Sequence, residues 1–151
     1  MDMKGEQLIP LQQDKTWDAL NDIDVLKGTI PGCEKIERVS DFEFDVVMQA
    51  KIGPVSARFK GRMTLKDVNP PQGYTLSFDG QGGAAGFAKG EARVELLPDG
   101  AQTLLRYTAK ANIGGKLAQI GSRLVDGAAR KLADQFFTAF REQMSGNTGA
   151  E

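Results

Sequence analysis

Residues 116–144 read KLAQIGSRLVDGAARKLADQFFTAFREQM, and their pattern predicts one long amphipathic helix. At about 100° per residue, the apolar side chains share one broad arc of this helix. Arg123, Arg130 and Arg141 form a ridge on the other side, which we expect to face solvent together with Asp134. The apolar arc consists of Leu117, Ile120, Leu124, Val125, Ala128, Ala129, Leu132, Phe136 and Phe140. A helix of nearly thirty residues is about 40 Å long and needs a large apolar partner surface.

The partner surface is predicted upstream, where apolar and polar residues alternate. Apolar residues recur at every second position of residues 42–50 and again of residues 57–65, which is typical of strands with one buried face. Gly53-Pro54 lies between the two runs and indicates a turn. A two-residue loop there sets apolar against apolar side chains and opposite charges against each other. The expected pairs are Met48 with Phe59 and Asp45 with Arg62.

The remaining elements complete an α+β pattern. Residues 3–9 predict a first strand, and Asp14 and then Asp22 or Asp24 begin two short helices. Three more strands follow the first hairpin, and a turn at Asp99-Gly100 pairs Val94 with Leu105 and Ala92 with Tyr107. We therefore expect a curved antiparallel sheet of about seven strands around the long C-terminal helix. Residues 1–144 form one domain in this prediction, and residues 145–151 form a flexible tail.

The composition excludes several classes of function. The 151 residues carry a formal net charge of −1, which argues against a nucleic-acid partner. There is no histidine and one cysteine, Cys33, so we predict no disulfide, no histidine-based catalytic residue and no metal site. No apolar run is long enough to cross a membrane and the first residues lack a signal core, so we expect a cytoplasmic protein.

The inner face of the predicted sheet mixes large and small side chains. The residues expected to be buried beneath the helix are Phe44, Met48, Phe59, Met63, Phe78, Val94 and Leu105. The small inward residues are Gly90, Ala92, Ala109 and Ala111. Two interpretations remain open at this point. Either the helix approaches closely and fills the core, or an apolar pocket stays open beside the small residues.

A glycine-rich segment, residues 80–90, interrupts the alternation. It contains five glycines and fits either a bulged hairpin loop or a mobile flap at the mouth of a pocket. Phe87 shares its parity with Lys89 and Glu91, which points it outward as a contact surface or a lid.

Four motifs connect the chain to a known family. They are Ile30-Pro31-Gly32-Cys33-Glu34, residues 53–61 (GPVSARFKG), residues 82–90 (GGAAGFAKG) and residues 114–124 (GGKLAQIGSRL). In this order, and over nearly the whole chain, they resemble the CoxG family, the accessory proteins of molybdenum-containing carbon monoxide dehydrogenase. The resemblance implies the START-like (SRPBCC) helix-grip fold, in which a hydrophobic ligand commonly lies between the sheet and the long helix. It therefore favours the pocket over the filled core.

The resemblance also implies a function. We expect a non-enzymatic accessory protein, without a cofactor of its own, that serves a molybdenum-containing carbon monoxide dehydrogenase or a related oxidoreductase. It would bind a hydrophobic small molecule such as a quinone or lipid and link the enzyme to the inner face of the membrane. The expected pocket lining is Phe59, Phe78, Phe87, Ala92, Tyr107, Ala109, Leu117, Ile120, Gly121, Leu124 and Ala128.

Two other hypotheses about the function remain open, namely an enzyme and an assembly chaperone. Under all three hypotheses we expect contact with a membrane to be transient. A START-like cyclase or hydrolase would need an acid or base in the cavity, for which the inner face offers Tyr107 and Tyr74. An assembly chaperone would need no ligand at all. Residues 145–151 are neither apolar nor basic, so we expect no stable anchoring through them.

Overall fold

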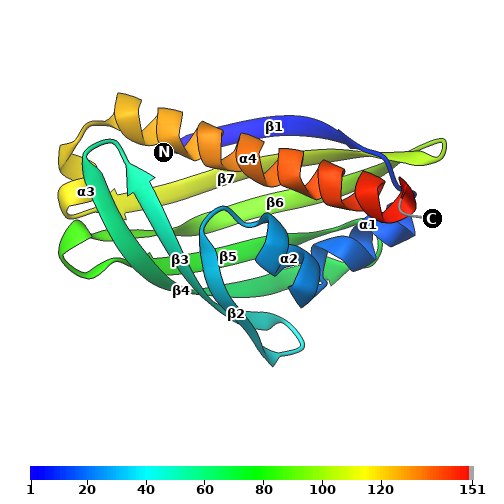
Figure 1. Cartoon of the computed structure of the whole chain (residues 1–151), viewed down its shortest axis with the longest axis horizontal. Helices are drawn as coiled ribbons and strands as arrows, with labels where there is room; N and C mark the ends of the chain where they lie inside the picture. The colour runs from blue at the N-terminus through cyan, green and yellow to red at the C-terminus, as the bar shows by residue number, and fades with distance from the viewer. Residues whose placement is uncertain (150–151) are drawn as a thin grey trace.

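One antiparallel sheet curls around the C-terminal helix, in the order of elements that the sequence predicts (Figure 1). The computed structural model describes residues 1–149, and side chains up to residue 145. The sheet has seven strands in the order β1-β7-β6-β5-β4-β3-β2. The strands are β1 (Asp2–Ile9), β2 (Cys33–Ser40), β3 (Glu43–Ile52), β4 (Val55–Asn69), β5 (Gly73–Gln81), β6 (Phe87–Asp99) and β7 (Gln102–Gly114). The helices are α1 (Gln13–Leu20), α2 (Ile23–Thr29), α3 (Lys116–Gln119) and α4 (Ser122–Gly149), with a 3-10 turn η1 (Gly83–Ala85). The predicted α+β helix-on-sheet class is confirmed.

The β3–β4 hairpin has the predicted register. Met48 lies opposite Phe59, and Asp45 lies opposite Arg62. Nε of Arg62 donates to Oδ1 of Asp45 at 2.8 Å, and this hydrogen bond lowers the pKa of the Asp45 carboxyl. Because side chains alternate between the two faces, the register fixes the apolar residues of both strands on the face that α4 covers.

The β6–β7 hairpin is shifted by two residues from its predicted register. Val94 lies opposite Tyr107, not opposite Leu105. The loop consists of Gly100 and Ala101, and Gly100 has a φ of 62°, which suits the first position of a two-residue hairpin loop. A shift of two residues keeps every side chain on its face, so apolar residues still meet apolar ones across the hairpin.

The predicted C-terminal helix is interrupted at Gly121. There φ is 98°, a left-handed conformation that favours glycine, so the short helix α3 ends before α4 begins at Ser122. At its other end, α4 continues past the predicted end at Met144 into residues predicted as a flexible tail. The last two residues of that tail, 150–151, lie outside the described part of the chain.

The two short helices begin close to their predicted positions. Asp22 caps α2, because its Oδ1 accepts hydrogen bonds from the backbone N–H groups of Asp24 at 2.9 Å and Val25 at 3.4 Å. Helix α1 begins at Gln13, so Asp14 lies in its first turn and the prediction that Asp14 caps this helix is wrong. No side chain caps α1.

The buried core lies at one end of the molecule, beneath the second half of α4. Phe137, Phe140 and Met144 pack there against α1, α2 and the neighbouring strands. Their buried partners are Ile9, Ala19, Leu20, Val25, Tyr74, Val94, Leu96 and Leu105. A second cluster beneath α2 contains Leu26, Ile36, Phe44 and Val46. Within residues 1–149, neither cluster includes a residue of α4 before Phe136, so the first half of α4 stands outside both.

A substitution at Gly90 tests how closely strands β6 and β7 approach each other. A Cβ added at Gly90 would overlap the carbonyl oxygen of Lys110 on β7, whereas a Cβ at Gly80 would meet Ala88 O at an ordinary 3.6 Å. We expect Gly90→Ala to lower the free energy of unfolding by about 2–3 kcal/mol, because β6 and β7 must move apart. The matched Gly80→Ala should change it by less than about 1 kcal/mol. Urea denaturation of both variants measures the difference, and equal losses would contradict this role of Gly90.

Candidate ligand-binding site

The concave face of the sheet beneath the first half of α4 is apolar and only half-buried. Strand register places side chains from β3 to β7 on this face. Nine of them stay half-buried, of which Met63, Leu65, Leu76 and Tyr107 pack against the two closed clusters. The half-buried face beneath the first half of α4 therefore consists of Met48, Phe59, Phe78, Ala92 and Ala109. The predicted burial is confirmed for Phe44, Val94 and Leu105 and is wrong for Met48, Phe59, Met63 and Phe78, which are only half-buried. A packed interior would exclude water from these side chains, so the first half of α4 leaves apolar surface accessible between helix and sheet.

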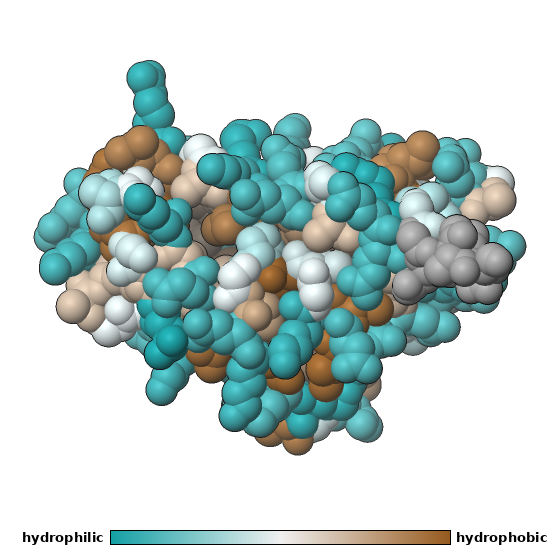
Figure 2. Space-filling model, in the orientation of Figure 1, coloured by the Kyte–Doolittle hydropathy of each residue, from teal (hydrophilic) through white to brown (hydrophobic). Residues whose placement is uncertain are grey.

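The α3–α4 junction forms the rim at one end of this face. Leu124 is 51% exposed, and Ile120 and Ala128 are half-buried. The turn of the β3–β4 hairpin reaches this rim, since a Cβ at Gly53 would lie 3.6 Å from Cδ1 of Ile120. Gly121 is exposed in the junction itself, and Figure 2 shows apolar surface between α4 and the hairpin.

The predicted residue Leu117 has a different position. It is 2% exposed and lies in α3, against η1 and the end of β7. Leu117 therefore belongs to the closed wall at this end of the molecule and is not open to solvent.

Tyr107 separates the closed core from the half-buried face. Its ring stacks on Phe137 with centroids 5.6 Å apart, and its hydroxyl lies above the backbone of Gly5 on β1. Burial raises the pKa of Tyr107, the carboxylate of Asp134 raises it further, and Arg130 lowers it. The phenol therefore stays protonated at neutral pH and is a weaker acid than an exposed tyrosine.

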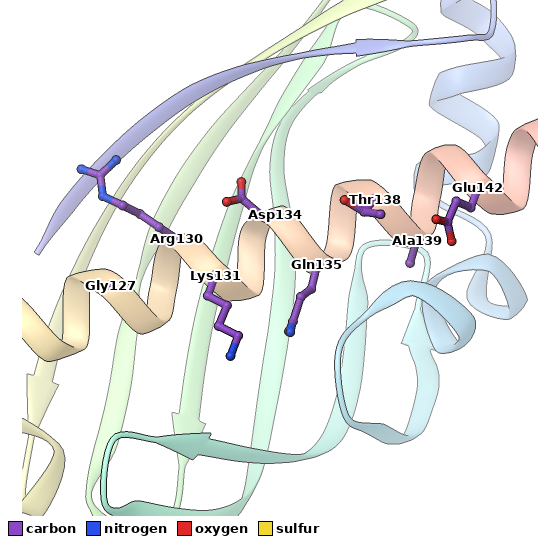
Figure 3. A pocket seen from close by; sticks show the side chains of 8 residues that line it. All are labelled: Gly127, Arg130, Lys131, Asp134, Gln135, Thr138, Ala139 and Glu142. Carbon is purple, nitrogen blue, oxygen red and sulfur yellow. The ribbon is translucent and has the colours of Figure 1, made fainter.

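The charged flank of α4 lies along the edge strand β1. Arg130 and Asp134 extend from the side of α4 that faces β1 in Figure 3. Further along, Nη1 of Arg141 donates to Oε1 of Gln7 on β1 at 2.5 Å. The predicted solvated ridge is confirmed for Arg123, Arg130 and Asp134, which are exposed, whereas Arg141 is half-buried and bonded to β1.

The glycine-rich segment is closed against the β7–α3 junction. A Cβ at Gly86 would overlap the backbone of Gly114 and Gly115, so glycine is required where the two chains approach. Phe87 lies over Gly114 with the ammonium of Lys89 5.9 Å from its ring centroid, on the convex face of the sheet. The prediction that Phe87 lines the pocket is therefore wrong, because strand parity turns it away from α4.

Two open depressions mark the surface, and the second meets the half-buried face at Ala109. One, of about 610 Å³, follows α4 from Gly127 to Glu142 (Figure 3). The other, of about 1080 Å³, crosses the edge formed by β1 and β7 and is lined by Met1, Met3, Ala109, Ala111 and Arg130, together with polar residues of the convex face. Among the predicted site residues, Ala109 alone lines either depression.

Strand β1 contributes residues that the sequence prediction of the site omits. Met3 lies opposite Ala109, and Gly5 lies opposite Tyr107, which places both on the concave face beside the predicted lining. Their signal is the alternation of Met3, Gly5, Gln7 and Ile9, which is weak because two of the four residues are not apolar.

Neither Cys33 nor Tyr74 forms part of a reactive site. Burial raises the pKa of the Cys33 thiol, so it is a weak nucleophile at neutral pH. Tyr74 is buried in the core edge-on to Trp17, with ring centroids 5.4 Å apart, and burial raises its pKa to about 12. Within residues 1–149, no group of three or more Cys, Asp or Glu side chains is arranged to hold a metal ion.

No helix in residues 1–149 has the length and hydropathy needed to cross a bilayer.

Solved structures with the same fold cover almost the whole chain. A conserved protein from Geobacillus kaustophilus is 29% identical with a TM-score of 0.90, covering 96% of this chain and 95% of its own. The Zhui aromatase/cyclase from Streptomyces sp. R1128 is 11% identical with a TM-score of 0.71, covering 98% and 95%. A START superfamily protein from Mycobacterium smegmatis is 13% identical with a TM-score of 0.71, covering 94% and 95%.

These likenesses establish the START-like helix-grip fold. No curated protein matches the sequence. The family model for the CoxG proteins of carbon monoxide dehydrogenase matches residues 5–145, so the chain belongs to the CoxG family.

Proposed function

We propose that this protein is a non-enzymatic carrier that binds a long apolar molecule, such as a quinone or a lipid, between α4 and the concave face of the sheet. The observation that carries the proposal is the row of half-buried apolar side chains beneath the first half of α4. Each CH₂ group moved from water to such a surface contributes about 0.8 kcal/mol, so a chain of ten carbons would gain enough to bind. Membership of the CoxG family supports an accessory role over a catalytic one.

The charged flank of α4 beside β1 suits the polar head group of such a ligand. Arg130 lines the depression at the edge formed by β1 and β7, and Asp134 lies on the same side of α4. Both act electrostatically on Tyr107 at the boundary of the apolar face. A quinone carbonyl or lipid headgroup placed there would keep hydrogen-bonding groups within reach while its tail lies on the sheet. Ligand pockets commonly combine an apolar lining with a few polar groups in this way.

The proposed partner is a molybdenum-containing carbon monoxide dehydrogenase or a related oxidoreductase. A quinone dissolves in the hydrocarbon of a membrane, where a water-soluble enzyme reaches it poorly. A carrier with an apolar site lowers the cost of moving the quinone out of the membrane to that enzyme. The family name supports this partnership, and the same arrangement would place the protein at the inner face of the membrane.

Ala109→Leu tests whether the face beside β1 is open. We expect the larger side chain to enter the half-buried space, so the free energy of unfolding should change by less than about 1 kcal/mol. Binding of decyl-benzoquinone, followed by isothermal titration calorimetry, should weaken at least tenfold because the space is occupied.

Ala111→Leu is the matched control on the same strand and the same face. Ala111 is 7% exposed, so the added atoms should overpack it and cost about 1–3 kcal/mol. If Ala109→Leu lost as much stability as Ala111→Leu and left quinone binding unchanged, the space would be a filled core, and the chaperone hypothesis would replace the carrier.

Tyr107→Phe separates a carrier from an enzyme. We expect decyl-benzoquinone to bind within about threefold of wild type, because the ring that stacks on Phe137 is retained. Mass spectrometry of the quinone after incubation should show it unchanged. A conversion that wild type performs and Tyr107→Phe slows by ~100-fold would point to proton transfer by the phenol and favour a cyclase-like enzyme.

A further inference from the structure

Three segments that are distant in the sequence meet at one end of the molecule. They are the β3–β4 turn region (residues 50–60), the connection from β5 to β6 (residues 80–90) and the stretch from the end of β7 into α4 (residues 111–125). Gly53 lies against Ile120, and Gly86 lies against Gly115, so both turns contact the third segment. Figure 1 shows them gathered at the end where α4 begins, opposite α1 and α2. We call this end the basic rim.

The basic rim has a one-sided charge. Its three segments contain six Lys and Arg residues and no Asp or Glu, although the whole chain has 19 basic and 20 acidic residues. The six are Lys51, Arg58, Lys60, Lys89, Lys116 and Arg123. In the described part of the chain, Arg58 pairs with Glu34 at 2.7 Å, and none of the other five has an acidic partner within ion-pair distance. Their charge is therefore available to an external anion.

The basic rim also exposes apolar side chains at its tip. Leu124 is 51% exposed, and Pro54 at the end of the β3–β4 turn is exposed beside it. Ile52 and Ile120 next to them are half-buried. An apolar tip flanked by unpaired lysine and arginine matches the chemistry of a lipid surface, which offers hydrocarbon beneath a layer of anionic headgroups.

We propose that the basic rim docks on an anionic membrane, with Leu124 and Pro54 entering the headgroup layer and Lys51, Lys116 and Arg123 facing lipid phosphates. The inference rests on the proposed function, because a carrier of an apolar molecule must meet the bilayer that dissolves it, and Leu124 and Ile120 lie at this end of the half-buried apolar face. The exposed Leu124 favours a lipid surface over an acidic protein, which would need the cations alone. Each basic residue close to an anionic membrane raises partitioning about fivefold.

Vesicle co-sedimentation of the whole chain tests the docking surface. The probes are vesicles of phosphatidylcholine and phosphatidylglycerol at 3:1 and vesicles of phosphatidylcholine alone, at low salt. We expect Lys116→Glu with Arg123→Glu to weaken binding to the anionic vesicles by at least ~20-fold. The matched control is Lys15→Glu with Lys27→Glu, which makes the same charge change on α1 and α2 and should stay within about threefold of wild type. Leu124→Ser should weaken binding about tenfold, since an inserted leucine side chain is lost.

Several results would overturn the docking surface. No binding of wild type to anionic vesicles, or an equal loss in both double variants, would do so. Unchanged vesicle binding by Leu124→Ser would overturn the insertion of the apolar tip into the headgroup layer. Circular dichroism melting checks that the variants fold. Decyl-benzoquinone titration without vesicles separates this inference from the carrier function: intact quinone binding with no docking defeats the docking surface alone, and docking without quinone binding defeats the carrier alone.

Discussion

The packing of Phe137, Phe140 and Met144 against the sheet holds the rest of the structure in place. These three side chains attach the second half of α4 to β1, β6 and β7, with Phe140 and its partners Leu96 and Leu105 at most 1% exposed. Each fully buried side chain of this size contributes about 1.5–3 kcal/mol, which makes this end of the helix the principal attachment. Because α4 is held firmly at one end, its first half does not need to close on the sheet to keep the fold.

This asymmetry links the stability of the fold to its proposed function. A helix that packed tightly along its whole length would fill the concave face and leave no room for a ligand. Here the first half of α4 leaves Met48, Phe59 and Phe78 half-buried, and Tyr107 marks the boundary between the two regions. The left-handed Gly121 separates α3 from α4 at the opposite end. There α3 packs against η1 and β7, and the β3–β4 turn lies against Ile120.

The sequence predicted the order of elements and the β3–β4 register because both depend on local alternation and charge pairing. Asp45 opposite Arg62 could be placed because a shift of one residue would bring opposite faces together. The β6–β7 register was less determined, since a shift of two residues keeps apolar residues facing each other and only the conformation of Gly100 selects between the alternatives. The break at Gly121 was missed because an amphipathic arc does not report backbone conformation.

The candidate site was harder to predict than the fold, for physical reasons that particular residues illustrate. The sequence pattern predicts that Gly90 leaves room for a ligand, but glycine is required there because the backbone of Lys110 lies where a Cβ would be. The predicted lining includes Phe87, but its parity with Lys89 places it on the convex face. How far α4 stands from the sheet depends on the summed volume of side chains from several strands, which no local pattern reports. The unpaired charge of the basic rim likewise appears only when three distant segments are brought together.

Native mass spectrometry of the purified 16.3 kDa chain after incubation with decyl-benzoquinone tests the central claim most directly. A carrier should retain one quinone per chain as a discrete mass increase that survives gentle desolvation and disappears on denaturation. A spectrum with the mass of the free chain alone, at quinone concentrations well above those expected to saturate the site, would contradict an open apolar site beneath α4.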